Sequence, residues 1–143
     1  MALSPEDPLA HRALESLLRA EAALRRALWA DLHRHGLSAS GFSVLVLLSS
    51  AGGELELRAL RQRLRSSKAN VTEVISTLQS RGLVSSRRLP NDRRAASILL
   101  TRTGREVVEE LFPEHSGRVR EVFSVLDEQE KRSLMSLCRK LAA

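Results

Sequence analysis

Two pairs of arginines stand on either side of a turn-like segment in the middle of the chain. Residues 87–94 read RRLPNDRR, with four arginines in eight residues. Proline restricts φ, and Asn and Asp accept turn geometry, so LPND is expected to reverse the chain. Guanidinium groups held this close repel one another unless anions offset their charge. The segment is therefore expected to meet the phosphates of a polyanion.

The distribution of charge along the chain favours the same interpretation. The net charge is +6, and residues 54–105 carry 12 Arg and Lys against 4 Asp and Glu. The segment before this block is neutral, and the segment after it is slightly acidic. A basic block between such flanks is typical of a module that binds a polyanion, although a merely charged surface is the simpler alternative.

The composition indicates one compact, largely helical protomer. The chain has 143 residues, of which 43% are apolar and only 3% aromatic, so we expect a core of Leu, Val and Ala. No apolar run approaches the ~20 residues that a membrane span needs. The N-terminus lacks a basic region followed by an apolar stretch, and Cys138 is the only cysteine. These features predict a cytoplasmic protein without an intrachain disulfide.

Apolar spacing predicts a helix-turn-helix preceded by a long helix. Leucines at spacings of three, four and their multiples predict a helix over residues 9–35, which Gly36 ends. Three shorter helices are expected over residues 38–50, 56–64 and 68–81. Ser38 or Ser40 is expected to cap the first of them. The inward face of the last one is expected to consist of Val71, Val74, Ile75 and Leu78.

A hairpin and further helices are predicted after the helix-turn-helix. Residues 83–89 and 96–101 read as strands on either side of the turn at PND. Caps or kinks of the later helices are expected at Thr101 or Thr103, Pro113 and Asp127. The predicted fold is therefore mainly α with a small β-hairpin wing, a winged helix-turn-helix with N- and C-terminal dimerisation helices.

Two sequence motifs, one in the predicted hairpin and one in the helix before it, resemble those of a known family. The hairpin contains Asp92-Arg93-Arg94, then AASIL, then Leu100-Thr101-Arg102-Thr103-Gly104, and SSKANVTEVISTLQSRGLV at 66–84 precedes it. Together they resemble the wing and recognition helix of the MarR family of bacterial winged-helix regulators, and the resemblance covers nearly the whole chain. It implies a homodimeric transcription regulator that binds double-stranded DNA, usually a ligand-responsive repressor.

The resemblance also assigns roles to the residues of the wing. Arg94 would enter the minor groove, whose narrow form in A·T-rich DNA attracts guanidinium groups. Asp92 would brace the wing by pairing with an arginine, and Arg88 and Arg93 would meet phosphates. A solvated, charged turn without a partner is the alternative for this hairpin.

The exposed face of the helix over 68–81 offers the candidates for reading bases. The N-terminal part of such a helix contacts base edges. The candidate DNA-binding residues here are Ser66, Ser67, Lys68, Asn70 and Thr72. Asn can form two hydrogen bonds with adenine, and the methyl group of Thr can touch thymine. Glu73 has two open roles: pairing with a nearby arginine, which we favour, or accepting a hydrogen bond from cytosine N4.

The N- and C-terminal helices carry more apolar surface than a small winged domain can cover. A two-fold dimer is the expected solution, as the resemblance also implies. Candidate interface residues are Leu14, Leu18, Val122, Leu134, Leu137 and Leu141. The alternative is that they cover only the core of their own protomer. The expected division is a dimerisation helix at 1–36, a DNA-binding lobe at 37–104 and dimerisation helices at 105–143.

Residue spacing gives no sign of an enzyme, a cofactor or a metal site. No catalytic spacing of Ser, His and Asp, no carboxylate pair and no phosphate loop is present. A small-molecule effector, such as an aromatic anion, is implied by the resemblance, with Trp29, Phe42 and Phe112 as candidates to line its cleft. Cys138 is interpreted as a buried apolar residue. Two other functions stay open: a winged-helix module that binds protein, and a metal or redox sensor with DNA binding as its output.

Overall fold

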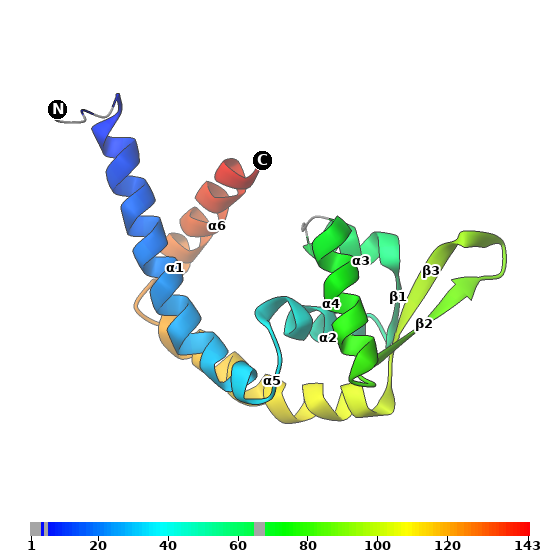
Figure 1. The fold of residues 1–143 in the computed structure, drawn as a ribbon. Coiled ribbons are helices and arrows are strands. Elements are labelled where there is room, and N and C mark those ends of the chain that lie inside the picture. Colours follow the sequence, from blue (N-terminus) through cyan, green and yellow to red (C-terminus); the bar gives the residue numbers. More distant parts are fainter. Residues whose placement is uncertain (1–3, 5, 65–67) are drawn as a thin grey trace. The chain divides into compact units, whose positions relative to one another are not determined.

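The computed structural model describes residue 4, residues 6–64 and residues 68–143, with the backbone alone at residues 68, 69 and 92–94. Its elements, labelled in Figure 1, are α1 (Pro8–Arg34), α2 (Ala39–Ser50), β1 (Glu54–Glu56), α3 (Leu57–Leu64), α4 (Lys68–Ser80), β2 (Val84–Leu89), β3 (Asp92–Leu100), α5 (Arg102–Phe123) and α6 (Glu128–Ala142). They form two units, Asp31–Glu114 and the pair Met1–Ala30 with His115–Ala143. The three-part division expected from the sequence stays a prediction.

Local signals set the boundary between α1 and α2 as predicted. Gly36 has φ +72°, a left-handed conformation that side chains with a Cβ rarely adopt, and it follows the last turn of α1. Ser38 then caps α2, because its side chain accepts a hydrogen bond of 3.0 Å from the amide of Gly41. The predicted long first helix and the Ser38 cap are confirmed.

The core of the unit Asp31–Glu114 is built from the sheet and from helices α2, α3, α4 and α5, together with Leu32 near the end of α1. Its most deeply buried side chains are Leu45, Leu48, Leu60, Leu78, Ile98, Val44 and Val71. The predicted inward face of α4 is confirmed, since Val71, Ile75 and Leu78 are buried and Val74 is half-buried. One stripe of α4 is thereby held against the core, so its opposite stripe must face outward.

The sheet has three antiparallel strands in the order β1-β3-β2, where the sequence predicted a two-stranded hairpin. β1 is only three residues long, too short to show an alternating pattern. It pairs with β3 through Glu54 and Leu99, and through Glu56 and Ser97. β3 also begins at Asp92 rather than at residue 96, because it pairs with β2 right up to the two-residue turn at Pro90 and Asn91.

The junction between the sheet and α5 requires a glycine. Thr101 caps α5, as predicted, by accepting a hydrogen bond of 3.0 Å from the amide of Gly104. The Thr101 hydroxyl also donates to the carbonyl oxygen of Gly82 at 2.7 Å. A Cβ at Gly104 would stand 2.1 Å from the carbonyl oxygen of Leu83, so a larger residue cannot occupy this position without a backbone shift.

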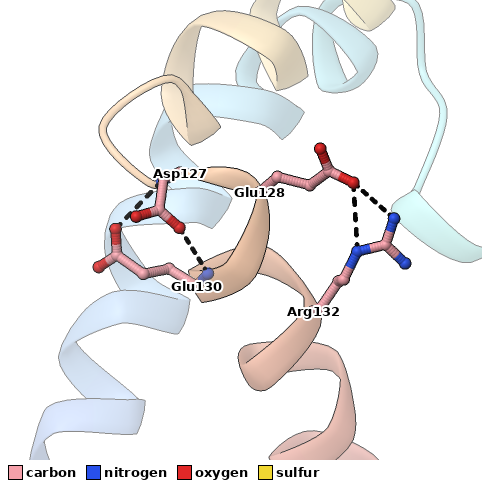
Figure 2. Close-up of polar contacts among 4 residues, drawn as sticks. All are labelled: Asp127, Glu128, Glu130 and Arg132. Carbon is pink, nitrogen blue, oxygen red and sulfur yellow. Dashed lines mark hydrogen bonds and ion pairs between the residues drawn. The ribbon is translucent and has the colours of Figure 1, made fainter.

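The last helix begins with a reciprocal cap, which Figure 2 shows. The Asp127 carboxylate accepts from the amide of Glu130 at 2.8 Å, and the Glu130 carboxylate accepts from the amide of Asp127 at 3.1 Å. Glu128 and Arg132, one turn apart, form an ion pair on the same helix. The predicted Asp127 cap is confirmed, and Pro113 lies inside α5 without ending it.

The unit formed by Met1–Ala30 and His115–Ala143 leaves large apolar side chains uncovered. No residue of α6, all of which the structure describes, is buried in this chain. The exposed fractions of the predicted interface leucines run from 38% at Leu134 to 74% at Leu141. Cys138 lies on α6 and is exposed, so its interpretation as a buried core residue was wrong for the single chain. Among the described helices, none combines the length and apolar character needed to span a membrane.

Candidate nucleic-acid interface

The outward stripe of α4 carries the polar residues predicted to contact bases. Asn70, Thr72 and Glu73 are exposed, while Val71 between them is buried. Lys68 is the first residue of α4, and its side chain is not described. Ser66 and Ser67 lie outside the described residues. The helix therefore presents Asn70 and Thr72 away from the core, as a base-reading role requires.

A pocket of about 310 Å³ lies beside α4, between this helix and the start of α2. Its polar lining includes Ser38, Asn70, Glu73, Thr77 and Arg81. The Arg81 guanidinium donates to the carbonyl oxygens of Gly36, at 2.6 Å, and His35, at 2.9 Å. These bonds tie the end of α4 to the turn that follows α1.

Glu73 is exposed and is one of the residues that line this pocket. Among the residues that the structure describes, no ion pair of the Glu73 carboxylate is present, and the guanidinium of Arg81 is directed to backbone carbonyls. Arg81, which also lines the pocket, thus already donates its hydrogen bonds to backbone carbonyl oxygens. Both roles considered for Glu73 stay predictions.

The hairpin of β2 and β3 carries the predicted wing arginines. Arg88 is exposed on β2, next to an irregularity in the pairing between Arg88 and Leu89. The backbone places Asp92, Arg93 and Arg94 at the start of β3, directly after the turn at Pro90 and Asn91. Figure 1 shows this end of the hairpin extending beyond β1. The three residues therefore lie at the tip of the hairpin, as the wing motif predicted.

A cluster at the base of the hairpin was not found by sequence reasoning. Glu54 Oε1 accepts hydrogen bonds from Arg87 Nε at 2.8 Å and from Ser97 Oγ at 2.7 Å. The Ser97 hydrogen bond, and then the Arg87 guanidinium, lower the pKa of Glu54 below its ordinary value. The partners are 33 and 43 residues from Glu54 in the sequence, so no local pattern signals the cluster.

A second contact joins the hairpin to the predicted recognition helix. The side-chain amide of Gln79, in the last turn of α4, donates to the Ser86 hydroxyl of β2 at 2.9 Å. The hairpin is thus connected to α4 through Gln79 and to β1 through Glu54.

The aromatic candidates for an effector cleft have different surroundings. Phe42 is buried in the core, and Phe112 is 42% exposed. Trp29 stacks on His115 with ring centroids 5.2 Å apart. Burial lowers the pKa of His115, partly opposed by a hydrogen bond with the backbone of Leu28. No cluster of three metal-ligating side chains occurs among the residues of known position.

Comparisons with known proteins agree with this arrangement. Residues 37–96 match the model of the MarR family. The HTH-type transcriptional regulator YkoM of Bacillus subtilis is 33% identical over 77% of this chain and 71% of its own. The transcriptional repressor MprA of Escherichia coli is 31% identical over 77% of this chain and 63% of its own.

A solved structure has the same fold over almost the entire chain. Sco3205, a MarR family transcriptional regulator from Streptomyces coelicolor solved in complex with DNA, is 26% identical, with a TM-score of 0.83. The superposition covers 99% of this chain and 89% of that one. The predicted winged helix-turn-helix is confirmed, and the relatives are transcription regulators rather than enzymes, as predicted.

Proposed function

Because the chain belongs to the MarR family of transcriptional regulators, we propose that it is a cytoplasmic, dimeric repressor that binds double-stranded DNA sequence-specifically and responds to a small ligand. One observation carries the proposal: the exposed polar stripe of α4 and the arginine-bearing hairpin belong to the same unit. The complex of Sco3205 with DNA supports it.

Base reading is assigned to α4 and groove binding to the wing. Asn70 and Thr72 are exposed where a helix in the major groove would place its reading residues, and Ser66, Ser67 and Lys68 would extend this contact toward the helix start. Arg88 and Arg93 would bind phosphates. Arg94, braced by Asp92, would enter the minor groove, where electronegative potential favours guanidinium.

Dimerisation is supported by the uncovered leucines of α1 and α6. Large apolar side chains exposed in such number on two helices are typical of an interaction surface. We propose that the interface contains Leu14, Leu18, Val122, Leu134, Leu137 and Leu141. The alternative, in which these residues cover only their own protomer, is opposed by the exposure of all five leucines. Two subunits would present two α4 helices to two half-sites.

Ligand response and repression are supported by relatives. The solved structure of BpsR from Bordetella bronchiseptica, 26% identical with a TM-score of 0.71, concerns the regulation of its DNA binding by 6-hydroxynicotinic acid. MprA is named a transcriptional repressor. An aromatic acid is accordingly the first ligand class to test on this protein.

The experiment is a selection of duplexes bound by the purified protein from random DNA, followed by titration of the recovered duplex and of a scrambled one. We expect a two-fold symmetric consensus and tighter binding of the recovered duplex. A winged-helix module that binds only protein would recover no consensus. Release of the duplex by aromatic acids, but not by divalent metals or peroxide, would separate ligand response from a metal or redox switch.

A further inference from the structure

One carboxylate joins all three strands of the sheet. Glu54 lies on β1, Ser97 on β3 and Arg87 on β2. Ser97 is the pairing partner of both Glu56 and Arg87, so these three side chains share one face of the sheet in a row. Glu54 lies two residues before Glu56 and therefore points to the same face. Its Oε1 atom receives the hydrogen bonds of both Ser97 and Arg87.

The position of β1 next to α3 allows this cluster to connect the hairpin to the helix-turn-helix. β1 ends at Glu56, and α3, the first helix of the helix-turn-helix, begins at the next residue. The pairs of β1 with β3 lie at the end of the hairpin far from the turn. A bond from Glu54 to β2 and β3 therefore connects the hairpin base to the start of α3.

The side chains of Arg87 and Arg88 lie on opposite faces of β2, and Arg87 is the one that meets Glu54. The Arg87 guanidinium approaches Glu54 Oε1 to 2.6 Å through Nη2 as well as through Nε. Adjacent residues of a strand face opposite sides, so Arg88 projects from the other face of β2. The positive charge of Arg87 is offset within the protein, where Glu54 is held ionised by its two donors.

We propose that Glu54 is a positioning residue that orients the wing against the helix-turn-helix, and that Arg87 serves this contact instead of binding a DNA phosphate. This inference rests on the proposed function. The pair is partly solvent-exposed, with 61% of the Arg87 side chain and 36% of the Glu54 side chain accessible. Exposed pairs contribute little to folding stability, so the effect is expected in DNA binding more than in unfolding.

The decisive variant is Glu54→Gln, with Glu56→Gln as its matched control. Both changes raise the net charge by one and lie on the same strand, but only Glu54 holds Arg87 and Ser97. Charge alone predicts that both variants bind every duplex slightly more tightly. Loss of orientation predicts that Glu54→Gln weakens binding of the selected duplex by about twofold to about tenfold, the cost of ordering one or two groups on binding. Binding of a scrambled duplex should not weaken.

Salt dependence and a charge swap test the two halves of the proposal separately. Arg87→Ala should leave the slope of log affinity against log salt unchanged, whereas loss of a phosphate contact reduces it by about 1. The double variant Glu54→Arg with Arg87→Glu keeps the net charge and should recover part of the lost preference for the selected duplex. Ser97→Ala provides a second variant if circular dichroism shows that Glu54→Gln does not fold.

The outcomes distinguish this inference from the proposed function. Wild-type protein that prefers no duplex overturns both. Wild-type preference for the selected duplex, with Glu54→Gln equal to Glu56→Gln, overturns the positioning role alone. A slope reduced by about 1 in Arg87→Ala but unchanged in Glu54→Gln assigns Arg87 to a phosphate and also overturns the positioning role.

Discussion

Arg87 and Arg88 are neighbours in sequence with different surroundings. Arg87 is bonded to Glu54 at the base of the hairpin, and Arg88 is exposed on the opposite face of β2. A count of arginines in the wing therefore overstates the number that can meet DNA. Each arginine needs its own test, since phosphate binding and groove reading leave different signatures in affinity.

Arg88→Ala and Arg94→Ala should differ in their effects. If Arg88 meets a phosphate, its loss weakens the selected and the scrambled duplex alike and reduces the salt slope by about 1. If Arg94 reads the minor groove, its loss weakens the selected duplex more, by roughly 1 to 3 kcal/mol. Titrations with both duplexes at two salt concentrations measure this. Wild-type behaviour of Arg94→Ala contradicts the minor-groove role.

At the scale of elements, the brace proposed for the wing and the charge of its tip predict opposite effects on DNA binding. Asp92 is the first residue of β3, at the hairpin tip. Removal of this acidic residue makes the wing more basic, so Coulomb attraction alone predicts tighter DNA binding. A brace predicts the opposite sign, because an unsupported tip must be ordered when it binds.

We therefore expect Asp92→Ala to weaken binding of the selected duplex. Asp92→Glu should retain part of the affinity, and Glu109→Ala, at an exposed position of α5, serves as a control that changes the charge equally outside the wing. The measurement is a titration with the selected and the scrambled duplex at low salt, where Coulomb effects are largest. Tighter binding of the selected duplex by Asp92→Ala would show that the hairpin tip acts only through its charge.

Gly104→Ala should destabilise the junction between the sheet and α5. Its Cβ would meet the Leu83 carbonyl oxygen at 2.1 Å and Leu100 Cδ1 at 2.8 Å. Overpacking of this kind costs about 1 to 3 kcal/mol of unfolding free energy. Gly117→Ala lies in the same helix, and its Cβ would meet no atom within 4 Å apart from its chain neighbours and the adjacent helix backbone. It should instead stabilise by about 0.5 to 1 kcal/mol. Urea unfolding monitored by circular dichroism gives both values, and equal signs would refute the steric argument.

At the scale of the whole molecule, the exposed leucines of α1 and α6 are the residues that we expect a second subunit to cover. Three of them, Leu18, Leu137 and Leu141, have exposed fractions of 57%, 58% and 74%. Cys138 also lies on α6. Its exposure in the single chain is consistent with a residue that a partner subunit would cover. Burial of these side chains between subunits would remove apolar area from water on both partners.

The protein should be a dimer at micromolar concentration. Light scattering is expected to report twice the chain mass of 15.9 kDa. Leu137→Asp should shift the population toward monomer, because a carboxylate buried in an apolar interface is costly. Leu9→Asp, at another exposed leucine not assigned to the interface, is the control. A stable wild-type monomer would remove the basis for paired half-sites.

Much of this protein follows from local sequence. Gly36 and Ser38 mark the boundary between α1 and α2, and Asp127 marks the start of α6, because caps act between residues only a few positions apart. The inward face of α4 and the wing motif were also readable, since helix periodicity and a turn are properties of short segments. From them the sequence predicts the winged helix-turn-helix and its family.

Only the tertiary structure decided how the wing is attached. The three residues of β1 have no pattern of their own, and they form a strand because β3 provides a pairing partner. Glu54 meets Arg87 and Ser97 across 33 and 43 residues, a contact that depends on the order of strands and the register between them. Sequence shows which side chains are charged, but the three-dimensional pairing determines that Glu54, Arg87 and Ser97 act together at the base of the wing.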